Sequence, residues 1–317
     1  MKRALIVCAA AVGAIAFACV AGSDGVHLPS HDIFMLLRLP RIVLGLCAGA
    51  ALSAGGVTCQ ALLRNPLADP YVLGLSGGAA LGAVLASTLA WGGPPPMWVA
   101  IGSACAGAWL ASLLVFAAPG RTVPVGALLL SGVVFNAFAA AVITLVKTLV
   151  SANKAQEVLF WLMGQLEMYD YYYIGGLCAA VAVGIGIVLW HGRALDVLVQ
   201  GDDTAHTLGV DLASVRRQLY FALTLLIGSV VAVTGLIGFV GLVIPHLVRA
   251  GTGARHRPLI VLSALWGAIL VVVADALCRL AFVFFATELP VGVLTAFIGA
   301  PFFVVVLRRS RAGELFS

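Results

Sequence analysis

Ionisable residues inside apolar stretches are the first candidates for chemistry in this sequence. Asp275 and Arg279 stand four residues apart in one such stretch, and Lys147 stands in another. If such stretches span a membrane, the carboxylates and bases within them can couple the movement of a substrate to protons or ions. Residues at positions i and i+4 of a helix can equally neutralise each other as an ion pair. Both interpretations of Asp275 and Arg279 remain open, but the scarcity of such charges argues against transport driven by an ion gradient.

Motifs for nucleotide or metal chemistry are absent from the sequence. None of its lysines follows a glycine, so it has no GxxxxGK[ST] phosphate-binding loop, and it has no HExxH zinc motif. The seven cysteines occur singly within apolar stretches and lack the spacing of zinc sites or disulfide frameworks. We therefore expect no enzymatic activity, no metal site and no cofactor bound by this chain. If the chain transports a solute, a partner protein must supply the energy.

The composition indicates that a membrane surrounds the elements carrying these residues. Hydrophobic residues make up 62% of the 317 residues and charged residues only 10%, with a mean hydropathy of +1.11. Soluble domains are about 25% charged, so this chain could not cover a globular surface with polar groups. Its continuous apolar runs are typical of spanning helices, because strands of membrane barrels alternate instead. The sequence predicts an all-α polytopic integral membrane protein. Its net charge of +5 does not indicate nucleic acid binding, because the basic residues gather at the ends of the apolar runs.

The apolar segments set the expected number of transmembrane helices. They are 4–22, 41–59, 71–90, 97–117, 125–150, 172–190, 219–248, 259–281 and 290–307. Segment 219–248 is too long for one span of about 20 residues and short for two. If the chain turns back near Gly235, Gly238 and Gly241, the basic clusters return to one side, as the positive-inside rule requires. We therefore expect about ten transmembrane helices, both termini in the cytoplasm, and a single domain over residues 1–317.

A polar segment with two prolines interrupts the apolar sequence between the second and third spans. It reads LLRNPLADPYVLGLSGG over 62–78. Pro66 and Pro70 remove backbone donors and stop a helix from running through, which predicts a bend. The glycines that follow, including Gly74 and Gly78, have the i, i+4 spacing that lets helices approach closely in lipid. We expect tight helix packing directly behind the bend.

The longest loop on the predicted cytoplasmic side, 194–218, has the pattern of two short helices. Asp202 suits the first turn of a helix, where carboxylates meet unpaired amides. Ala205 and Leu208 share one apolar face, and Gly209 suits the position after a helix end. Such a segment can dock a cytoplasmic protein, or it can rest on neighbouring loops of its own chain. The residues alone favour neither interpretation.

Five motifs, in the same order along the chain, resemble a known family. They are RLPR (38–41), QALLRNPLADPYVLGLSGG (60–78), LGV within GDDTAHTLGV (201–210), GLIGFVGLVIPHLVR (235–249) and ELPVGVLTAFIGAPFF (288–303). Over residues 36–310 the chain resembles the FecCD-like family, the permease subunits of ATP-driven (ABC) importers for iron–siderophore complexes, haem and vitamin B12. The resemblance implies a multi-pass permease of the bacterial inner membrane that moves such a metal chelate from periplasm to cytoplasm. A transporter driven by an ion gradient, without an ATPase, is the alternative.

The resemblance also implies partners. Members form a homodimer in the lipid bilayer, with two cytoplasmic ATPase subunits that bind ATP and Mg²⁺ and a periplasmic substrate-binding protein that delivers the chelate. The segment 201–210 matches the family's coupling helix within the loop 194–218. The residues expected to contact the ATPase are Asp202, Ala205, Leu208 and Gly209.

The bend corresponds to the family's cytoplasmic gate. The implied gate residues are Asn65, Leu67, Thr122 and Val125. Beside a dimer axis, Leu67 can plug the pathway and Asn65 can form a hydrogen bond across it. Pro124 and Val125 stand where the family has a small polar pair.

Basic residues at the outer end match those that pair with acidic groups of the binding protein. They are Arg38, Arg41 and Arg279. Such ion pairs steer and register a partner. Because Pro40 stiffens the chain between them, we expect Arg38 and Arg41 to project from the surface. Without the resemblance, arginines that meet lipid phosphates would be the simpler interpretation.

Overall fold

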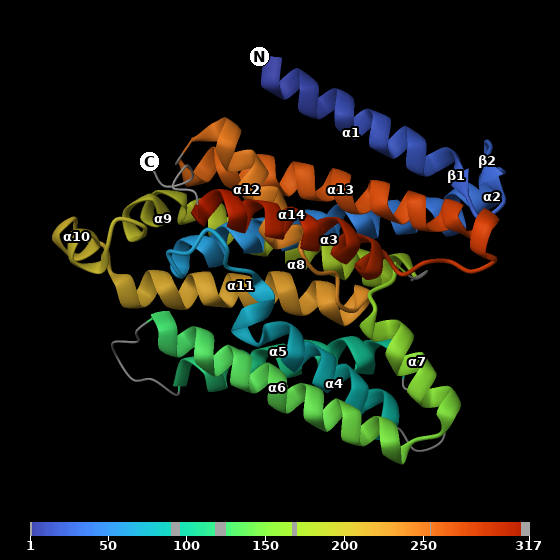
Figure 1. The fold of residues 1–317 in the computed structure, drawn as a ribbon, viewed down its shortest axis with the longest axis horizontal. Coiled ribbons are helices and arrows are strands. Elements are labelled where there is room, and N and C mark those ends of the chain that lie inside the picture. Colours follow the sequence, from blue (N-terminus) through green and yellow to red (C-terminus); the bar gives the residue numbers. More distant parts are fainter. Residues whose placement is uncertain (1, 90–95, 118–124, 167–169, 254, 312–317) are drawn as a thin grey trace.

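The computed structural model describes residues 2–89, 96–117, 125–166, 170–253 and 255–311. These residues form an elongated bundle of helices (Figure 1). The short helices α9 (Gly192–Leu198) and α10 (Asp202–Thr207) lie at one end of the bundle, which we call the inner end. The antiparallel strands β1 (Ala21–Gly22) and β2 (Gly25–Val26) lie at the opposite, outer end.

The long helices match the predicted spans. They are α1 (Lys2–Val20), α3 (Leu39–Leu62), α4 (Leu75–Leu89), α5 (Met97–Ala117), α6 (Val125–Leu149), α8 (Tyr171–Trp190), α11 (Leu212–Thr234), α12 (Val240–Thr252), α13 (His256–Phe285) and α14 (Val291–Arg311). Among the described residues, six helices are long and apolar enough to cross a membrane, and four further apolar helices are shorter. Helix α1 begins toward the inner end, and α14 ends there. The prediction of an all-α multi-pass membrane protein with about ten transmembrane helices is confirmed.

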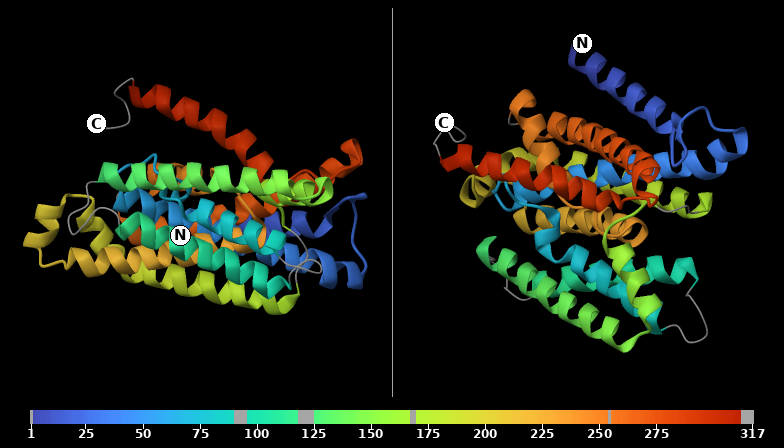
Figure 2. Two further views of the ribbon diagram at one scale, coloured as in Figure 1. Left: turned by 90° about the horizontal axis from the view of Figure 1, so that it is seen from below. Right: turned by 45° about the vertical axis from the view of Figure 1, so that its right-hand side comes forward.

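Helices α3 and α11 form the centre of the bundle. In the most apolar stretch of each, 78% of the residues are buried, against 28% for α5 and α8 and 17% for α6. Helices α1 and α14 lie at the periphery of the bundle (Figure 2). The peripheral helices therefore present apolar surface to lipid or to another chain. The remaining elements are α2 (His31–Ile33), the π-helical turn η1 (Phe34–Arg38), the 3₁₀ turn η2 (Pro70–Leu73) and α7 (Ala152–Leu162).

The segment predicted to double back, 219–248, is broken where expected. Helix α11 ends at Thr234 and α12 begins at Val240, and both Gly235 and Phe239 have a φ of +66°. A Cβ at Gly235 would collide with a carbonyl oxygen of α7, so glycine serves both the turn and the close approach.

The protein itself satisfies the backbone of this break. The Tyr71 hydroxyl donates to the carbonyl oxygen of Ile237 (2.8 Å) and accepts from its amide (3.0 Å). The amide of Gln165 donates to the carbonyl oxygen of Thr234 (2.8 Å). Non-helical backbone at membrane depth needs such partners, because lipid offers none. The break is therefore a built feature of the bundle.

Glycines bring neighbouring helices together, as their spacing predicts. A Cβ at Gly49 on α3 would collide with the carbonyl oxygen of Gly267 on α13, and one at Gly78 on α4 with that of Gly107 on α5. Small residues at such crossings allow the backbone contact on which helix association in lipid depends. One cysteine contact was not expected from the sequence: the thiols of Cys47 on α3 and Cys178 on α8 lie 3.3 Å apart.

Candidate functional site

The bend between α3 and α4 is a compact turn, which we call the inner turn (63–74). Its first polar residue, Arg64, adopts a left-handed backbone conformation with a φ of +48°. The Asn65 side chain accepts a hydrogen bond from the amide of Leu67 (2.9 Å), and its carbonyl oxygen accepts one from the amide of Ala68 (3.0 Å). This is the Asx turn that the Asn-Pro pair favours. In this conformation Asn65 stabilises its own turn, whereas the sequence suggested a bond across the pathway.

The inner turn is also tied to other helices. Asp69 caps η2 by accepting from the amide of Tyr71 (2.8 Å). The Asn136 side chain on α6 donates to the carbonyl oxygen of Tyr71 (2.8 Å), and the Tyr71 hydroxyl holds the break before α12. Direct hydrogen bonds therefore join the inner turn to α6 and to the break before α12.

Of the predicted gate residues, the structure brings two together. Asn65 and Leu67 lie side by side in the inner turn, and both are half-buried. Val125 is the first residue of α6, and Thr122 lies outside the described residues. The gate assignment stays a prediction.

The predicted coupling segment consists of α9, α10 and the start of α11. Asp202, in the first turn of α10, accepts hydrogen bonds from Arg216 on α11 (2.8 and 3.0 Å). It also pairs with Arg64 of the inner turn. Arg64 in addition donates through Nε to the carbonyl oxygen of Leu198, at the end of α9 (2.8 Å). One carboxylate thus joins the inner turn to the coupling segment.

Electrostatics keep this carboxylate charged. Burial acts to raise the pKa of Asp202, but the hydrogen bonds and charges of Arg216 and Arg64 outweigh it and hold the pKa below its ordinary value of 3.8. The Asp202 side chain is 46% exposed, so solvent screens the pair and its contribution to stability is small. The contact can therefore form and break at low cost.

The four predicted coupling residues do not share one face. Ala205 is fully buried against the chain's own helices, and Asp202 is bound to Arg64 and Arg216. Leu208 is 62% exposed, and Gly209, with a φ of +77°, faces open space. Asp202 and Ala205 therefore anchor α10 to this chain, which leaves Leu208 and Gly209 for a partner. The contact with an ATPase stays a prediction.

The outer end holds a second carboxylate that two arginines share. Asp275 on α13 binds Arg279 one turn later (3.0 Å) and Arg41 on α3 (3.1 Å). Arg41 also binds Glu288, after α13 (3.0 Å). Of the two interpretations of Asp275 and Arg279, the structure favours neutralisation. The i, i+4 spacing indicated that pair, but no sequence signal indicated that Arg41 binds Asp275 and Glu288.

The expectation that Arg38 and Arg41 project from the surface is wrong, because Arg38 is buried and the Arg41 side chain, bound to Asp275 and Glu288, is only 17% exposed. The Arg38 and Arg279 residues are only 6% and 4% exposed. Arg279 donates to the carbonyl oxygens of Ala18 (3.1 Å) and Ala21 (2.7 Å), and Arg38 donates to those of Cys19 (3.2 Å) and Ala21. Carbonyls at a helix end lack intrahelical partners, and the two guanidinium groups supply them for α1. The docking assignment stays a prediction, and it requires both side chains to leave these carbonyls.

Comparison with known proteins identifies the family to which the chain is similar. The FecCD transport family model matches residues 4–309. The cobalamin import system permease protein BtuC of Halobacterium salinarum is 40% identical, over 90% of this chain and 75% of that protein. The hemin transport system permease protein HmuU of Yersinia pestis is 36% identical, over 88% of this chain and 84% of that protein.

A solved structure has the same fold. It is a metal-chelate type ABC transporter in an inward-facing conformation, 29% identical, with a TM-score of 0.87 over 97% of this chain and 98% of that one. The break before α12, the inner turn and the coupling segment all lie within the span that the family model matches. The chain therefore belongs to the FecCD transport family.

Proposed function

We propose that this chain is the permease subunit of an ATP-driven importer that moves a metal chelate, such as an iron–siderophore complex, haem or cobalamin, into the cytoplasm. The family and the names of its relatives support this class of function. The proposed mechanism rests on the Arg64–Asp202 pair, because this pair joins the exposed helix α10 to the inner turn. An ion-gradient-driven transporter is not favoured, since Asp275 is neutralised by two arginines.

In the proposed assembly, two copies of the chain sit side by side in the bacterial inner membrane. Two ATPase subunits, which hold ATP and Mg²⁺, dock at the inner end on Leu208 and Gly209. A periplasmic binding protein delivers the chelate at the outer end. There the Arg41 side chain is 17% exposed and binds the exposed Glu288. It is the arginine best placed to exchange that glutamate for an acidic group of the binding protein.

The transport step follows from the contacts of α10. Closure of the ATPase pair on ATP displaces α10, and the Asp202–Arg64 contact passes the displacement to the inner turn. Asn65 and Leu67 move with that turn, and the hydrogen bonds of Tyr71 carry the movement to α6 and α12. The predicted gate, with Thr122 and Val125 as its second part, then opens toward the cytoplasm.

Reconstitution tests this proposal. The chain is co-purified with its ATPase, placed in vesicles, and supplied with binding protein and each of a ferric siderophore, haem and cobalamin. We expect uptake of one chelate class that requires ATP. The control is the same assembly with a hydrolysis-deficient ATPase, which should not transport. Uptake driven by an ion gradient in vesicles that lack the ATPase would show the proposal to be wrong.

A further inference from the structure

A surface groove opens between the inner ends of α8 and α13. Its volume is about 670 Å³. Its walls are apolar along most of their length, with Gly186 and Leu189 on α8 and Val261 and Leu262 on α13. A Cβ added at Gly186 would meet nothing within 4 Å, so this residue leaves open space at the α8 wall of the groove. The groove can hold a hydrocarbon chain that runs along the helices.

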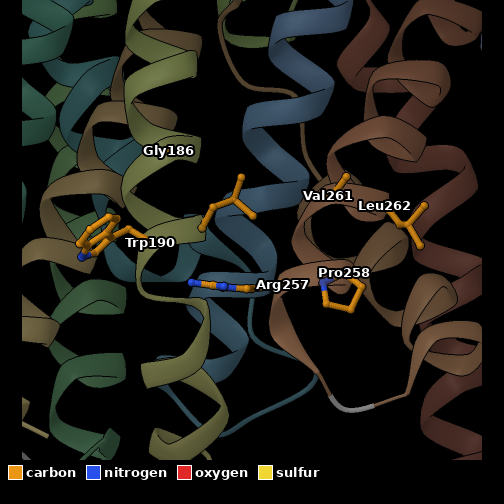
Figure 3. Close-up of a pocket in the computed structure, with 7 residues that line it drawn as sticks. Gly186, Trp190, Arg257, Pro258, Val261 and Leu262 are labelled. Atoms are coloured by element: carbon orange, nitrogen blue, oxygen red, sulfur yellow. The ribbon is translucent and has the colours of Figure 1, made fainter.

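A cation stands at the mouth of this groove. Figure 3 shows the Arg257 side chain extending from the first turn of α13 toward α8. Its stem crosses Gly192, where a Cβ would lie 2.5 Å from the Arg257 Cγ, so the absence of a side chain there fixes the path of the arginine. Within the described part of the chain, the guanidinium has no hydrogen bond or ion-pair partner. An arginine held in place without an acceptor suits a ligand that carries one.

The charge around the mouth is unbalanced. Arg193 and Arg255, close neighbours of the mouth in the chain, are exposed and likewise make no side-chain bond within the described residues. The adjacent carboxylate, Asp196, already accepts from the amide (2.8 Å) and the ring (2.7 Å) of His256. The mouth is therefore cationic, and its natural complement is an anion.

An aromatic residue marks the depth of the mouth. Trp190 ends α8 and is 80% exposed. Tryptophan gathers where lipid headgroups meet the apolar core, because its ring is apolar and its N–H needs a polar partner. Arginines near the cytoplasmic ends of spans attract anionic lipids in the same zone. The groove thus combines an apolar track, an interfacial aromatic ring and an unpaired cation.

We propose that this groove is a binding site for one anionic phospholipid of the inner leaflet. One acyl chain lies along Gly186, Val261 and Leu262, and the phosphate accepts hydrogen bonds from Arg257. A second copy of the chain or a partner helix fits less well, because it would have to supply an acidic group at the one depth where Arg257 stands.

A second groove at the inner end provides an internal contrast. It has a volume of about 370 Å³ and is lined by residues of α1, α12 and α13, including Ile6, Val248 and Trp266, with no charged residue among those that line it. An acyl chain can enter either groove. Only the groove at Arg257 can select a headgroup by charge.

The test is lipid binding by the purified full chain, measured by native mass spectrometry with phosphatidylglycerol and phosphatidylcholine. We expect the unmodified chain to prefer phosphatidylglycerol. Arg257→Gln should reduce that preference roughly fivefold, the effect of one arginine near a lipid surface. The control is Arg308→Gln, which removes an equal charge from an exposed arginine of α14 and should leave the preference unchanged. Equal losses in the two variants would mean non-specific attraction and would overturn the proposal.

A second variant tests the apolar track without changing charge. Gly186→Leu places a side chain in the groove from its α8 wall and should weaken phosphatidylglycerol binding, while the size-exclusion profile and the thermal stability stay unchanged. Unchanged binding would show that no acyl chain lies along Gly186. Inorganic phosphate and short-chain glycerophosphate, added in excess, should not displace the lipid; displacement would show that the site takes a soluble anion instead. A photo-reactive residue at position 189 that captures a second copy of the chain, in place of lipid, would also refute the proposal.

Discussion

The two ends of the molecule use the same device in opposite ways. At each end, one aspartate is shared by two arginines from different segments: Asp202 by Arg64 and Arg216 at the inner end, Asp275 by Arg41 and Arg279 at the outer end. The Asp202 side chain is 46% exposed and that of Asp275 only 2%. Burial strengthens an ion pair and also makes its rupture costly.

The unequal burial of the two aspartates indicates a different role for each cluster. The outer cluster joins α3 to α13 and, through Arg279, closes the end of α1, so we interpret it as a latch that keeps the outer end rigid. The inner cluster joins α10 to the inner turn in water, where ion pairs contribute little to stability. It can therefore move without unfolding the bundle.

The strongest challenge to this comparison is removal of the outer carboxylate. Asp275→Ala leaves Arg41 and Arg279 buried without their shared partner, so we expect a loss of about 3–5 kcal/mol in stability. Thermal unfolding in detergent measures it. Glu288→Gln is the control, because that side chain is 42% exposed and its loss should lower the midpoint only slightly. If both variants unfold alike, the latch is not the buried pair.

The next expected effect concerns the docking face of α10. Leu208→Glu places a charge at an exposed apolar position. We expect binding of the ATPase, measured by pull-down or interferometry, to weaken at least about tenfold, as for a central residue of an interface. Thr207→Glu adds the same charge at an exposed neighbour and should have less effect. Retention of the ATPase by the Leu208 variant would remove this residue from the interface.

A smaller and more specific effect is expected at Arg64. Arg64→Ala breaks the contact between α10 and the inner turn but removes nothing from the docking face. ATPase binding should persist, while ATP-driven uptake per ATP hydrolysed should fall by about fivefold or more, the usual range of coupling between sites. Arg217→Ala, at an exposed neighbour on α11, is the matched control. Full coupling in the Arg64 variant would mean that the signal takes another path.

The smallest expected effect is a dependence on pH. The pKa of Asp202 is lower in the folded chain than its ordinary value of 3.8. A carboxylate with a depressed pKa stabilises the fold above that ordinary value, and this contribution is lost as pH falls through the folded-state pKa. Hydrogen exchange of α10 amides, corrected for the intrinsic rate, should therefore be constant from about pH 7 to 5 and rise only in stronger acid. A rise already near pH 6 would contradict the assigned partners.

Much of the fold followed from local sequence. Apolar runs of spanning length predicted the helices, and the break at Gly235 followed from length and charge. Pro66 and Pro70 predicted the inner turn, since both act on the backbone within one or two residues. The pair of Asp275 and Arg279 was visible because their spacing is that of one helical turn.

The partners of the polar side chains could not be predicted in this way. Asp275 and Arg41 are 234 positions apart, and Arg64 and Asp202 are 138 apart. An arginine at a helix end can bind lipid phosphate, a partner protein or a backbone carbonyl oxygen. Its neighbours in the sequence do not indicate which of these it binds. The burial of Arg38 depends on where α1 ends against α3 and α13, which only packing decides.

The membrane environment, the number of spans and the places where helices break could be predicted from the amino-acid sequence, because they depend on hydropathy and backbone chemistry summed over short windows. Which of the two aspartates is a latch and which is a movable contact could not be predicted in this way. The strength of an ion pair depends on how much water the surrounding helices exclude, and those helices come from distant parts of the chain.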